Sequence, residues 1–165
     1  MRRLLVAVVL FLLAAPVAAS SARAETPEEW IALGTRVHGG FGAFIPLGIR
    51  IGLDAVERLK AQPRELAVLY YDSDKSPCAC FADGIAIATT ASAGQRSLVI
   101  APEKAPEGAI AVAVIRPRKG GPGFKYTIPA SALGVLGPMN ATLDPKGRWD
   151  AVMKTDGLFT VQAAP

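Results

Sequence analysis

The spacing of apolar and polar positions predicts two helices after residue 24. The first covers residues 26–37, with Thr26 as the N-cap, Pro27 at the first helical position and two glutamates beside the positive end of the helix dipole. A glycine-rich turn at 38–42 follows. A second, longer helix is predicted over 44–60, where the apolar positions recur at helical spacing.

Small residues line one face of this second helix. Gly48, Gly52 and Ala55 fall on the same side, and small side chains let another backbone approach closely. The pattern favours tight packing of this helix against a sheet over a seam between two copies of the chain. A homodimer remains open as an alternative.

The middle of the chain reads as strands around one further helix. The apolar run 65–72 predicts a buried strand, 79–91 a helix that starts near the cysteines, and 97–100 and 109–117 two more strands. The glycine- and proline-rich stretch 116–123 predicts an exposed basic turn.

The end of the chain carries weaker patterns. A short helix is predicted over 131–136, a turn-rich tail from Pro138, and a strand within 157–162. Taken together, the elements predict a single α+β domain: a mixed sheet packed against a long N-terminal helix and a cysteine-bearing helix.

The longest apolar run lies at the very start. Arg2 and Arg3 precede the run 4–19, and Ala22-Arg23-Ala24 supplies small residues at the spacing of a cleavage site. This order is typical of a secretory signal peptide, here residues 1–24, and the run is short for a membrane span. We therefore expect a periplasmic or secreted domain over 25–165 and no stable membrane span.

The signal peptide changes the charge of the protein. The chain has 18 lysines and arginines against 14 acidic residues, and Arg2, Arg3 and Arg23 lie in the signal. The remaining 15 against 14 give a net charge of +1. The basic pI of 9.3 thus belongs mostly to the signal, and nucleic acid is not an expected partner.

Three side chains carry most of the candidate chemistry: His38, the one histidine, and Cys78 and Cys80, the two cysteines. Two thiolates and an imidazole are one ligand short of a tetrahedral zinc site, and water, Asp74 or Asp83 could supply the fourth. Direct ligation of one ion requires His38 to lie within about 10 Å of Cys80.

Two other interpretations stay open. In an oxidising compartment, cysteines two positions apart tend to pair, and the small, strained ring that this closes is easily reduced, which suits a redox role. Alternatively, Cys80 is a small buried residue at a helix start, His38 bonds a backbone carbonyl, and Asp83 interacts with the helix dipole. No nucleophile elbow, phosphate loop or dinucleotide fingerprint occurs in the sequence.

The motif residues themselves carry a family resemblance. They run His38-Gly39-x-Phe41, Gly48-x-Arg50-x-Gly52, Cys80-x-x-Asp83-Gly84-Ile85, and Thr89 followed by Gly94. In order and spacing this resembles the core domain of the family named after the E subunit of formylmethanofuran dehydrogenase, over about Trp30 to Pro117. The resemblance implies an α+β domain with a site around His38, Cys80 and Asp83.

The sequence departs from the family pattern at several polar positions. Gly40 stands where the family has a second histidine, and Gly42 and Ala91 stand where it has cysteines. No cysteine follows Cys80, so the C-terminal zinc finger of many members is absent, and Cys78 is an additional thiol. The intracellular methanofuran chemistry of the family is therefore not expected here.

These observations lead to one favoured function and two alternatives. We expect an exported metal- or ligand-binding accessory protein, with His38, Cys80, Cys78 and Asp83 as candidate ligands of a divalent transition metal such as zinc, and with a small molecule or a protein as its partner. The alternatives are a periplasmic thiol-redox protein that uses Cys78 and Cys80, and an interaction module without a site.

Overall fold

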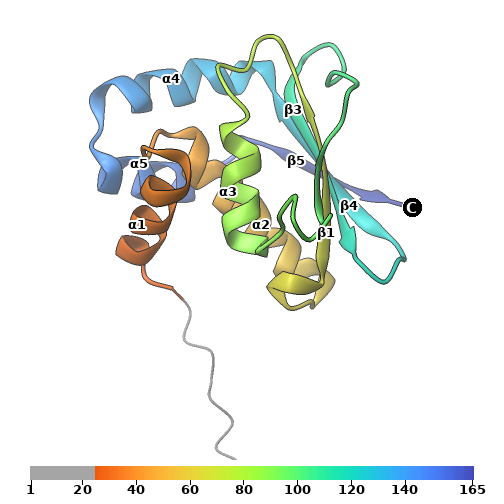
Figure 1. Ribbon diagram of the computed structural model, residues 1–165. Coiled ribbons are helices and arrows are strands. Elements are labelled where there is room, and N and C mark those ends of the chain that lie inside the picture. Colours follow the sequence, from red (N-terminus) through yellow and green to blue (C-terminus); the bar gives the residue numbers. More distant parts are fainter. Residues whose placement is uncertain (1–24) are drawn as a thin grey trace, which may run out of the picture.

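The computed structural model describes residues 25–165, so the predicted signal peptide lies outside the described residues. Helices cover one face of a five-stranded sheet (Figure 1). The elements, in chain order, are α1 (Pro27–His38), α2 (Phe44–Leu59), β1 (Leu66–Asp72), α3 (Cys80–Thr89), β2 (Leu98–Ile100), β3 (Ala109–Pro117), β4 (Gly123–Pro129), α4 (Leu133–Thr142), α5 (Pro145–Lys154) and β5 (Thr160–Ala164). Among the described residues, no helix has the length and apolar character needed to cross a bilayer.

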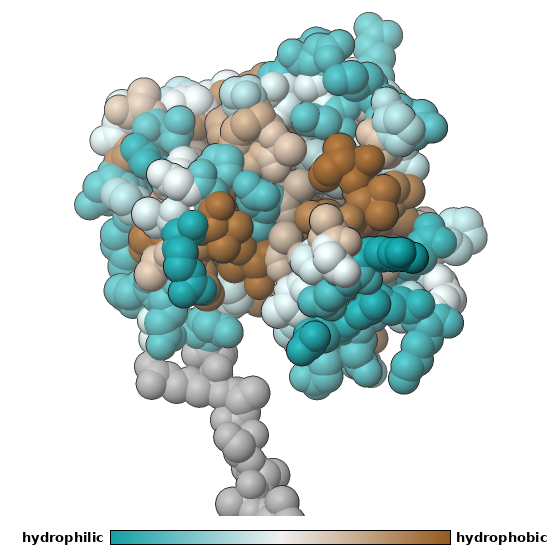
Figure 2. All heavy atoms as spheres, in the orientation of Figure 1, coloured by the Kyte–Doolittle hydropathy of each residue, from teal (hydrophilic) through white to brown (hydrophobic). Residues whose placement is uncertain are grey.

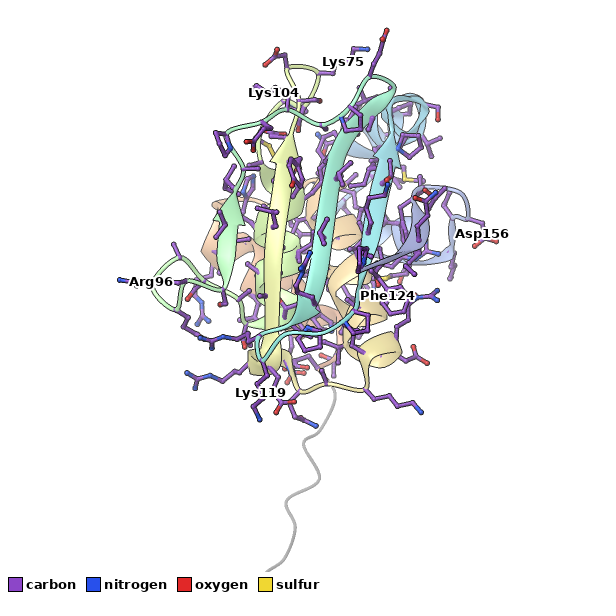
Figure 3. The ribbon with its side chains drawn as sticks, turned by 90° about the vertical axis from the view of Figure 1, so that its right-hand side faces the viewer. Lys75, Arg96, Lys104, Lys119, Phe124 and Asp156 are labelled. Carbon is purple, nitrogen blue, oxygen red and sulfur yellow. A yellow bond between two sulfur atoms is a disulfide. The ribbon has the colours of Figure 1, made fainter. Side chains whose placement is uncertain are left out.

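The predicted α+β fold is confirmed, and the sheet is mixed. Its strand order is β2-β1-β3-β4-β5; β1 and β2 run parallel, and the other neighbours are antiparallel. In β1, Leu66, Val68 and Tyr70 are buried in strict alternation with half-buried residues, so one face of the strand packs against the helices. Figure 3 shows the other face, with the helices behind it and Arg96 and Lys104 near its margins.

Most of the surface on the side of Figure 1 is polar. Figure 2 shows hydrophobic side chains at the surface in two areas, over the helices and at the edge of the sheet. Val37 at the end of α1 and Val99 and Ile100 in the edge strand β2 are large apolar residues with exposed side chains. The edge strand is only three residues long, which limits its use as a template for pairing.

The predicted α1, α2, α3, β1, β2 and β3 are confirmed to within two residues at each end. The prediction for the tail was wrong. Instead of turns, two helices follow residue 132, and β4 and β5 add two strands to the sheet, with β5 at 160–164. Asp144 explains the start of α5, because its side chain accepts a hydrogen bond from Gly147 N at 2.7 Å and caps the helix.

The small-residue face of α2 packs against a helix, so the expected contact with the sheet was wrong. Gly48 crosses Gly84 of α3 so closely that a Cβ on Gly48 would overlap the Phe81 carbonyl oxygen and lie 2.9 Å from the Gly84 Cα. A Cβ on Gly84 would overlap the Ile45 carbonyl oxygen. This crossing fixes the start of α3, and with it Cys80, beside the turn that follows α1.

The C-terminal helices hold that turn from the other side. Ala43 N donates to Asn140 Oδ1 at 3.2 Å, and Arg148 donates to the carbonyl oxygens of Phe41 at 3.0 Å and Asn140 at 2.8 Å. The Phe41 ring also packs near Trp149 of α5, with ring centroids 6.5 Å apart. The tail therefore helps to position the turn that carries His38.

Candidate metal and thiol site

His38 is the last residue of α1. The helix ends at Gly39, which adopts the left-handed conformation at φ 85° and donates its N–H to Thr35 O at 2.9 Å. A residue with a Cβ would be strained there, so glycine suits this stop. The chain then turns away, and the imidazole of His38, with 27 % of its side chain exposed, is left beside the start of α3.

The two cysteines enter the site from the loop before α3 and from its first residue. Cys78 is half-buried in the loop, where its carbonyl oxygen accepts a hydrogen bond from Ser76 Oγ at 2.6 Å. Cys80 begins α3 and is only 4 % exposed. The two are joined as a disulfide, with Cα atoms 5.2 Å apart, and the part of the chain that the structure describes holds no free cysteine.

The histidine and both sulfurs meet at one point. A ring nitrogen of His38 and the Sγ atoms of Cys78 and Cys80 all lie within 4.8 Å of one another. The prediction that His38 lies near Cys80 is confirmed, although about forty residues separate them. A zinc ion sits about 2.0–2.3 Å from nitrogen and sulfur ligands, so a small contraction of this group would bring all three donors onto one ion.

Asp83 reaches the site through His38. It lies three residues after Cys80, on the same face of α3, and its Oδ2 lies 2.7 Å from His38 Nδ1. A carboxylate on one ring nitrogen fixes the ring orientation and directs the other nitrogen outward, as in histidines that bind metals. The structure thus places Asp83 as the partner of His38 and not within the three-donor group.

Asp74, the other candidate for a fourth ligand, points elsewhere. Its side chain is 87 % exposed and pairs with Lys104 at 2.8 Å. The three-donor group therefore leaves a fourth coordination position for water or for a ligand from outside. A site of this kind can polarise what it binds, unlike a structural zinc site with four protein ligands.

Two buried polar atoms near the site escaped the sequence analysis. The Tyr70 hydroxyl and Asp72 Oδ1 have no hydrogen-bond partner among the described residues. Burial raises the pKa of Tyr70 far above its usual range, and the charges of Asp72 and Asp83 raise this pKa further. Tyr70 reads as an ordinary core residue of a strand, so no local pattern could have identified this neutral hydroxyl near the His38–Asp83 pair.

Comparison with known proteins places the fold and the family. The chain shares its fold with the crystal structure of a tungsten formylmethanofuran dehydrogenase FmdE-like protein from Syntrophus aciditrophicus, at a TM-score of 0.52 and 15 % identity over 85 % of this chain and 72 % of that one. No curated protein matches the sequence. The family model "FmdE, Molybdenum formylmethanofuran dehydrogenase operon" matches residues 37–145, more than half of the chain and all four site residues, and the protein therefore belongs to the FmdE family.

Proposed function

We propose that this protein is a metal-binding accessory protein of the FmdE family. Its ion would be a divalent transition metal such as zinc, held by His38, Cys78 and Cys80 when both cysteines are thiolates. The observation that supports this most is the meeting of the three donors within 4.8 Å. Two soft sulfurs and one imidazole form a donor set that favours zinc over magnesium or calcium.

Asp83 would serve as the orienting partner of the histidine ligand. Its hydrogen bond to His38 Nδ1 leaves the second ring nitrogen as the donor to the ion. The fourth coordination position would accept a small molecule or a group from a partner protein. This gives the site a binding role that does not depend on the family's name.

Formylmethanofuran dehydrogenase activity is not part of the proposal. The family and the Syntrophus protein take their descriptions from molybdenum and tungsten formylmethanofuran dehydrogenases. In this chain Gly40, Gly42 and Ala91 replace polar or thiol groups of the family pattern, which depletes the site around the three remaining donors. An accessory role that needs one ion and one ligand fits these residues better.

Export forms the second part of the proposal. The basic start, the apolar run and the small-residue site support cleavage after Ala24 and a mature protein in the periplasm or outside the cell. An oxidising compartment is also where a disulfide between Cys78 and Cys80 would persist.

Metal titration of the full chain, reduced and kept free of oxygen, tests the proposed site. We expect one zinc per chain in the wild type, none in Cys80→Ser, and strongly weakened binding in His38→Ala, because a thiolate and an imidazole are the strongest ligands available. Cys78→Ser should weaken binding less, and Asp83→Asn by about 10- to 100-fold, as for the loss of an outer-shell partner. Unchanged zinc binding in Cys80→Ser would contradict the proposal.

A further inference from the structure

We infer that the Cys78–Cys80 disulfide is exchangeable, that external thiols attack it at Cys78, and that its reduction creates the metal-binding form of the site. The exchange step stands on the disulfide itself. The link to the metal rests on the proposed function, so the two parts need separate measurements.

The two sulfurs differ in access, which determines where a thiol can attack. Cys78 is half-buried in the loop ahead of α3, whereas Cys80 is 4 % exposed and belongs to the core beneath the helices. Thiol–disulfide exchange needs access to one sulfur only, along the line of the bond that breaks. Cys78 is therefore the sulfur that an external thiolate reaches.

The surroundings of Cys80 suit a leaving group. Cys80 opens the ten-residue helix α3, whose N-terminus has no side-chain cap, so the positive end of the helix dipole faces the sulfur. The His38 ring lies within 4.8 Å on the other side, held by Asp83. Both features stabilise negative charge on Cys80, and a more stable thiolate leaves faster.

The reaction balances with a dithiol reductant. One thiolate of the reductant attacks Cys78 Sγ, the bond between the two protein sulfurs breaks, and its electron pair stays on Cys80. The second thiolate then attacks the reductant's own sulfur in the mixed disulfide and releases Cys78. The reductant ends as a disulfide, and the protein gains two electrons and two thiolates.

The two states exclude one another at the metal site. A sulfur in a disulfide carries no thiolate charge and is not a ligand for zinc, whereas the thiolate is the metal-binding form. Oxidation by a small-molecule disulfide reverses the sequence and releases the ion. Metal occupancy would thus report the redox poise of the compartment.

Rates of thiol exchange test the first part of the inference. Dithiobis(nitrobenzoate) is a coloured disulfide that can be given to two full-chain variants with one cysteine each. Cys78 in Cys80→Ser should react at least about tenfold faster than Cys80 in Cys78→Ser, because exchange follows access. In urea the two rates should converge. Equal rates in the folded proteins, or a wild-type disulfide that dithiothreitol leaves intact under native conditions, would overturn this part.

Zinc binding to oxidised and reduced wild type tests the second part. We expect zinc in the reduced protein, none in the oxidised protein, and release of the ion when oxidised glutathione is added. Equal binding in both states would overturn the link between redox state and metal while leaving the proposed metal site standing. Zinc in neither state would contradict the proposed function and the link together, and the exchange rates would still decide the first part.

Discussion

At the scale of single residues, two buried tyrosines form a matched pair. The Tyr126 hydroxyl donates to Asp54 Oδ2 at 2.7 Å, whereas the equally buried Tyr70 hydroxyl has no partner among the described residues. Tyr126→Phe should lower the free energy of unfolding by about 1–3 kcal/mol, since it leaves a charged acceptor unpaired, and Tyr70→Phe should be neutral or stabilising. Urea unfolding measures both. A cost for Tyr70→Phe as large as that for Tyr126→Phe would show that the Tyr70 hydroxyl is bonded in solution.

The same tyrosines predict loss of stability in alkali. Burial raises the pKa of Tyr70 and Tyr126, so the folded protein keeps protons that the unfolded chain loses above about pH 10. Their contribution is complete below that pH and falls as the pH rises further. The urea midpoint of the wild type should therefore decrease above about pH 10, and that of the Tyr70→Phe, Tyr126→Phe double variant should decrease less. Parallel curves would contradict the assignment.

Part of the site was predictable because the sequence offers so few reactive side chains. With one histidine and two cysteines, any shared site had to bring His38 near Cys80, and the structure does so. Asn140 and Arg148 were not predictable as supports of the turn after His38. They lie in a segment about a hundred residues away, and only tertiary packing brings them to that turn.

At the scale of elements, the crossing of α2 and α3 fixes the site. Gly48→Ala puts a methyl group into the backbone of α3 and should lower the free energy of unfolding by about 3 kcal/mol or more. Gly134→Ala is the control, because Gly134 is exposed in α4 with open space around its Cα. There the same change should stabilise the protein by about 0.5–1 kcal/mol through helix propensity. Urea unfolding of both variants checks the contrast, and similar stabilities would contradict the packing of the two helices.

The elements that sequence patterns missed are those whose local signals conflict with the fold. Pro138 argues for a turn, yet α4 continues through it, and the helix is anchored by the fully buried Leu136. In β4, Gly123 and Pro129 look like turn residues, but the strand pairs with β3 and buries Tyr126 and Ile128. In both segments, tertiary contacts outweigh the local preference.

At the scale of the whole molecule, export determines what the protein contains. If the signal is cut, the mature chain begins at Glu25 and starts one residue before the N-cap of α1. Intact-mass spectrometry of protein recovered from the periplasm or the medium should therefore give the mass of residues 25–165 with the disulfide formed. A mass that includes Met1 to Ala24 would instead indicate a chain that keeps its N-terminal apolar segment.

The central claim is that one metal ion binds between α1 and α3 on His38, Cys78 and Cys80. X-ray absorption at the zinc edge tests this most directly, on the reduced, zinc-loaded full chain, with Cys80→Ser as the matched control. We predict two sulfur neighbours at about 2.3 Å and lighter atoms at about 2.0–2.1 Å in the wild type. A first shell of oxygen and nitrogen alone, or a spectrum unchanged in Cys80→Ser, would contradict the claim.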